Sequence, residues 1–177
     1  MRRLFLIAFA GVMLMPAAAF AERLAPGDGS LVVSGANGRL TVSGQGLIYG
    51  YFGSGTITVV GDYKPDDVNS LPSVTGATQS IVGKNTVYTG ASVRFYFPGG
   101  QYTLIVDATN IDISAVGHGT FSSIGRGLPN DGTFVVDTSK PRSIDTPGTF
   151  SFGKAVATVT PVTTTLQIPA LVTGKSH

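Results

Sequence analysis

The strongest constraint on the fold is a period-two alternation of apolar and polar residues between Ala91 and Gly119, interrupted by Pro/Gly-rich breaks. Such alternation is typical of half-buried strands. On either side of the break Pro98-Gly99-Gly100, the apolar positions are Val93, Phe95 and Phe97, then Tyr102, Leu104 and Val106. Proline and glycine suit a tight reversal of two strands, so the break predicts a β-hairpin. Ile111 and Ile113 extend the pattern, and Gly117-His118-Gly119 predicts the next reversal.

The same reasoning gives the other elements. Asn37-Gly38 predicts a type I′ turn between strands at 31–34 and 39–43, and Gly53-Ser54-Gly55 a turn into residues 56–60. Glycines at 44, 46 and 50 predict bulges or close backbone approach. Residues 61–76 are expected to be a long surface loop, and residues 78–82 and 86–89 a short pair across Gly83-Lys84-Asn85.

The fold class that follows is all-β, an antiparallel meander forming a small sandwich or barrel. No stretch beyond the first 21 residues has helical periodicity. A β-solenoid is the alternative, because residues 38–61 form a glycine-spaced run. The drifting spacing and the two hairpin-like turns favour the meander.

The beginning of the chain predicts export. Arg2 and Arg3 precede an apolar stretch over residues 4–15, and Ala19-Phe20-Ala21 is a small-x-small cleavage pattern. We interpret residues 1–21 as a secretory signal peptide, with no membrane span left after its cleavage, and expect a periplasmic or secreted protein. Residues 22–30 would be a flexible entry and 31–153 a single β domain. Residues 154–177 are a Thr/Val/Pro-rich tail, interpreted either as an extended tail or as an envelope-associating segment.

Composition excludes several function classes. Of the 12 Lys and Arg residues, two lie in the signal peptide, which leaves ten basic against ten acidic residues. A neutral chain without a basic cluster has no electrostatic footprint for nucleic acid. There is no cysteine, which excludes thiolate zinc sites, iron–sulfur clusters and cysteine nucleophiles. No cofactor is predicted.

Four tyrosines are the candidate binding residues. Tyr49 and Tyr51 share one strand face, Tyr96 alternates with Phe95 and Phe97, and Tyr102 begins the following strand. Exposed tyrosine rings can stack on sugars while their hydroxyl groups form hydrogen bonds. Ordinary packing also explains them, because aromatic residues favour strands.

Acidic residues give two further hypotheses. Asp62, Asp66 and Asp67 place three carboxylates in one loop, a possible weak calcium site, although no EF-hand or RTX-type spacing is present. A secreted hydrolase would have to use Asp107, Asp112 and His118. The chain has no G-x-S-x-G nucleophile elbow, and strand alternation explains both carboxylates as solvent-facing.

Residues 111–119, IDISAVGHG, and the run 38–59 resemble a group of uncharacterised secreted or envelope bacterial β-proteins with an I-D-x-S-A-V-G-x-G stretch. The resemblance covers roughly residues 38–137 and implies no assigned activity. The sequence therefore predicts an exported, non-catalytic β protein that binds or builds the bacterial envelope, with an envelope polysaccharide or protein as its partner. The secreted hydrolase is the alternative.

Overall fold

A computed structural model describes residues 26–67, 71–128 and 130–154, and these residues form an all-β fold. The predicted signal peptide, most of the entry segment and the tail beyond Lys154 lie outside this part of the chain. Eight strands form one curled antiparallel sheet, which confirms the predicted class. In chain order they are β1 (Gly29–Val59), β2 (Lys64–Pro65), β3 (Ser73–Val82), β4 (Asn85–Phe97), β5 (Gly100–Gly125), β6 (Thr133–Val136), β7 (Arg142–Ser143) and β8 (Thr149–Phe152).

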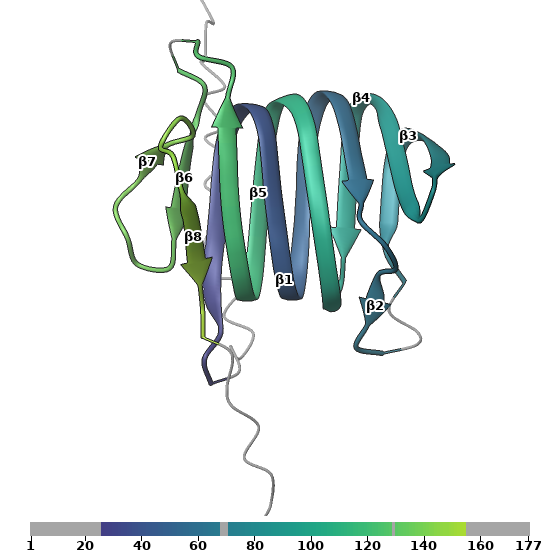
Figure 1. Cartoon of the computed structure of the whole chain (residues 1–177), viewed down its shortest axis with the longest axis horizontal. Coiled ribbons are helices and arrows are strands. Elements are labelled where there is room, and N and C mark those ends of the chain that lie inside the picture. The colour runs from purple at the N-terminus through teal and green to yellow at the C-terminus, as the bar shows by residue number, and fades with distance from the viewer. Residues whose placement is uncertain (1–25, 68–70, 129, 155–177) are drawn as a thin grey trace, which may run out of the picture.

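Two very long strands, β1 and β5, wind around a common axis (Figure 1). Leu40 of β1 pairs with Val106 along one edge and with Ser123, 17 residues further on, along the other. One antiparallel ribbon thus coils upon itself, and each coil pairs with the next. The strand order β2-β5-β1-β4-β3 follows from this winding.

The coil has two opposite walls, each a set of segments paired side by side. The first wall consists of residues 39–45, 56–59, 86–89, 101–107 and 118–124, with part of β3 and β8. The second wall consists of residues 30–34, 47–52, 93–97 and 111–116, with the beginning of β3 and with β6.

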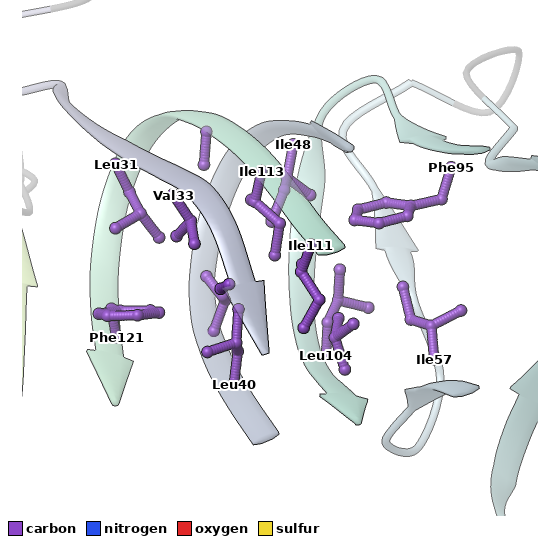
Figure 2. Close-up of a cluster of buried hydrophobic side chains, with 14 of the residues drawn as sticks. Leu31, Val33, Leu40, Ile48, Ile57, Phe95, Leu104, Ile111, Ile113 and Phe121 are labelled. Atoms are coloured by element: carbon purple, nitrogen blue, oxygen red, sulfur yellow. The ribbon is translucent and has the colours of Figure 1, made fainter. Parts of the chain in front are cut away.

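Inward side chains of both walls form one apolar core (Figure 2). Leu40, Leu104 and Phe121 point inward from the first wall and Ile48 and Ile111 from the second, all fully buried. Alternation in each wall puts apolar side chains inside and polar ones outside. Burial of this core drives folding in a chain without disulfides.

Several predicted reversals are instead bends within continuous strands. Asn37-Gly38 and Gly53-Ser54-Gly55 lie inside β1, and Gly117-His118-Gly119 lies inside β5, so these three turn predictions are wrong. Pro98-Gly99-Gly100 does separate β4 from β5, but these strands both pair with β1 and not with each other, so the hairpin predicted there is also wrong. At the three bends inside β1 and β5 the chain passes from one wall to the other without leaving its strand.

Glycine makes the tightest of these bends possible. Gly46 and Gly117 are paired, with φ angles of 131° and 142° that side-chain-bearing residues rarely adopt. A Cβ on Gly46 would lie 2.2 Å from the carbonyl oxygen of Val116. Close backbone approach at Gly44 and Gly46 is therefore as the sequence predicts.

The pair of strands predicted across Gly83-Lys84-Asn85 is confirmed as the β3–β4 hairpin, with Val82 opposite Asn85. The predicted loop 61–76 is shorter than expected, because β3 begins at Ser73 and Lys64–Pro65 pairs with β5.

Candidate ligand-binding groove

Three of the four predicted tyrosines meet on the outer surface of the second wall. Tyr49 of β1 lies directly opposite Tyr96 of β4, and Tyr51 lies two residues further along β1 on the same face. Tyr96 is 44% exposed, and Tyr49 and Tyr51 are half-buried. The rings come from two strands that are far apart in sequence and paired in the sheet.

These tyrosines border a groove of about 700 Å³ on this surface. Its other side is made by smaller residues of the neighbouring strands: Val32 pairs with Ser114, which in turn pairs with Tyr49. Most of the lining surface is apolar. A concave apolar surface with a few polar groups is the usual form of a small-molecule or glycan site. The lining residues are Val32, Val33, Ser34, Tyr49, Gly50, Tyr51, Arg94, Phe95, Tyr96, Asp112, Ile113 and Ser114.

Opposite charges flank the aromatic residues. Tyr51 pairs with Arg94 on one side and with Asp112 on the other. The Asp112 carboxylate accepts a hydrogen bond of 2.9 Å from the backbone N–H of Gly35, which fixes its position. Within the described residues, no hydrogen bond or ion pair holds the Arg94 guanidinium, which leaves its donors available to a ligand.

Tyr102 does not belong to this surface, and its assignment to the tyrosine face is wrong. It is 5% exposed and faces the core with Leu104 and Val106. Its hydroxyl group has no hydrogen-bond partner in the described part of the chain. Burial raises the pKa of the Tyr102 hydroxyl above its usual value, and the nearby Tyr63 adds to the shift.

The acidic loop residues are placed near the end of β4. The Asp66 carboxylate accepts a 3.3 Å hydrogen bond from the Gln45 side chain, and the Asp66 N–H lies 3.4 Å from the Gly99 carbonyl oxygen. Asp62 and Asp67 are exposed. Over residues 26–67, 71–128 and 130–154, no group of three or more His, Cys, Asp or Glu residues could hold a metal ion.

The three residues of the hydrolase hypothesis are not brought together. Asp107 lies on the first wall, where its carboxylate pairs with Arg39 at 2.8 Å and Arg126 at 3.8 Å. Asp112 lies on the second wall, in the groove. His118 lies at a bend, with its Nδ1 atom 4.0 Å from Asp28.

Sequence reasoning missed Arg94, Ser34 and Ser114. Arg94 alternates in phase with Tyr96, and this pattern was sufficient to place it on the same outer face. No local pattern brings residues 32–34 beside residue 114, since that contact depends on the winding of β1 around β5.

Comparisons with protein-family models, with curated proteins and with solved structures give no match to this chain. The described residues include no helix long and apolar enough to cross a membrane.

Proposed function

We propose that this is an exported, non-catalytic protein that binds an envelope polysaccharide through the tyrosine groove. The observation that carries the proposal is the meeting of Tyr49, Tyr51 and Tyr96 along one apolar groove. The C–H faces of sugar rings stack on aromatic rings, and tyrosine hydroxyl groups can hydrogen-bond to the sugar hydroxyls.

The two charged residues that flank Tyr51 favour a sugar polymer over a purely apolar ligand. Arg94 supplies several N–H donors, and the Asp112 carboxylate supplies acceptors on the opposite side of Tyr51. Donors and acceptors on both sides of a stacking platform suit a ring that carries hydroxyl groups around its edge. The hydrolase alternative has no comparable support, because its three residues lie at separate places on the coil.

The test begins with chain recovered after export, whose first residue we expect to be Glu22. This protein is applied to insoluble peptidoglycan, cellulose and chitin, and the retained fraction is measured against protein concentration. We expect selective retention on one polymer. Replacing Tyr49, Tyr51 or Tyr96 by alanine should weaken retention about five- to tenfold, as expected for loss of one aromatic contact.

Ile124→Ala is the matched control, because Ile124 is a 71% exposed apolar residue on the opposite wall. Its retention should equal that of the unaltered chain. Thermal unfolding of each variant checks that the sheet is intact. If all three tyrosine variants are retained as well as the unaltered chain, or if the unaltered chain is retained on none of the polymers, the groove is not the proposed polysaccharide site.

A further inference from the structure

One end of the coil presents an unprotected strand edge. In the described part of the chain, β3 pairs only with β4, so its other edge carries unpaired N–H and C=O groups. Natural proteins often protect such edges with charged side chains, lysine above all, or with proline. β3 has none of these among its ten residues, and its Ile81 and Val82 are 74% and 61% exposed.

The straight part of this edge is short and well defined. At Gly76, whose φ is 80°, a bulge in β4 interrupts the pairing and separates residues 73–75 from residues 77–82. Residues 77–82 are the last segment of the first wall. An added strand of about six residues would extend that wall by one.

The chain leaves the coil at the opposite end. β8 pairs with β5 far from β3 (Figure 1), and the N–H of Lys154 donates a 2.6 Å hydrogen bond to the Gly27 carbonyl. Twenty-three residues follow, and Lys175 is their first charged residue. Among them, residues 162–168, VTTTLQI, form an uncharged run of mainly β-branched and apolar residues between Pro161 and Pro169.

This run has the composition and the length of a strand that could pair with β3. β-Branched residues favour strands, and the two prolines limit the paired length to about that of residues 77–82. Addition of an extended segment to a free sheet edge is a common recognition mode, in which backbone hydrogen bonds supply much of the affinity.

We propose that residues 162–168 of one copy add as a strand to the free edge of β3 in a second copy. The donor segment follows one end of the coil and the acceptor edge lies at the other, so the contact is head-to-tail and each copy can accept one neighbour while donating to another. Such a heterologous contact builds a closed ring if the rotation between copies closes and an open filament if it does not. Either assembly would hold several tyrosine grooves together, and the proposal does not depend on what they bind.

The absence of natural cysteine permits a direct test by disulfide trapping. Ser80→Cys on β3 is mixed with chains that carry Thr163→Cys, Thr164→Cys or Thr165→Cys, each in the chain that begins at Glu22. After mild oxidation we expect at least one mixture to give the Ser80–tail heterodimer. The same tail variants mixed with Thr41→Cys, on the middle of the first wall, are the control and should give none.

Two results would overturn the proposal. One is the absence of the Ser80–tail heterodimer in all three mixtures. The other is a cross-link found only within one chain in the Ser80→Cys/Thr164→Cys double variant, because this would show that the tail folds back on its own β3.

A solution measurement provides an independent check. The sedimentation coefficient of the unaltered chain should rise with concentration. Ile81→Lys on the acceptor edge and Thr164→Pro in the donor run should each abolish this rise while leaving thermal unfolding of the coil unchanged. The proposal would be contradicted if the unaltered chain stayed monomeric at all concentrations, or if both variants still assembled.

Discussion

At the scale of single residues, Tyr102 shows how a buried polar atom marks a site of instability. Its hydroxyl group is buried and has no hydrogen-bond partner within the described residues. An unsatisfied buried donor costs about 1–3 kcal/mol. We predict that Tyr102→Phe raises the free energy of unfolding by about 1 kcal/mol at pH 7, because the ring remains and the hydroxyl group is removed.

Tyr102 also makes the free energy of unfolding depend on pH. Burial raises the pKa of Tyr102 in the folded state, whereas the unfolded chain releases the proton near pH 10.0. Above that pH the folded state binds more protons than the unfolded state, so stability falls as the pH rises. Urea unfolding at pH 7 and pH 11 should therefore show a larger advantage of Tyr102→Phe at pH 11. A variant that is less stable at pH 7 would mean that the hydroxyl group has a partner.

At the scale of elements, the sequence predicted strands well and bends poorly. Residues 102–108 bury their even-numbered side chains, and residues 111–115 bury the odd-numbered ones. The buried positions thus change phase between residues 108 and 111. In the structure this change is a bulge at Asn110, whose φ is 52°, inside one strand. A local pattern shows that the phase changes, but pairing with distant strands decides whether the chain reverses.

The sequence predicted part of the candidate site, namely the residues that local alternation places on a face. Alternation placed Tyr49, Tyr51 and Tyr96 on outer faces, and the structure brings them together. The same alternation put Tyr102 in phase with Leu104 and Val106, which indicated the core. The contribution of Ser34 and Ser114 depends on the coil as a whole and has no local signal.

The bends themselves can be tested by substitution. Gly46→Ala would place a Cβ 2.2 Å from a backbone oxygen at a φ of 131°. We predict that it lowers the free energy of unfolding by about 3 kcal/mol or more, from backbone strain and overpacking together. Gly61→Ala is the matched control, because Gly61 also has a positive φ, 68°, but nothing lies within 4 Å of the added methyl group. It should cost only about 1 kcal/mol. Equal losses in urea unfolding would show that the close approach at Gly46 is not limiting.

At the scale of the whole molecule, the winding of two strands makes the coil a single unit. In stacked-repeat proteins each repeat contacts only its neighbours, so ends can unfold separately. Here the middle of β1 pairs with β5 on both edges, and partners such as Gly29 and Gly117 are 88 residues apart. Opening the middle of the coil therefore breaks pairs of both long strands at once, which favours all-or-none unfolding of that part.

We therefore predict one cooperative unfolding transition, and slow refolding because nearly all pairing is between distant residues. The chain has no tryptophan, so tyrosine fluorescence and far-ultraviolet circular dichroism are the two probes. Ile48→Ala in the middle of the coil and Phe134→Ala near its β6 end both empty fully buried positions. They should lower stability by about 2–5 kcal/mol, with both probes giving the same midpoint in each variant. A separate, earlier transition in Phe134→Ala would show instead that the β6 end unfolds alone, as the end of a repeat array does.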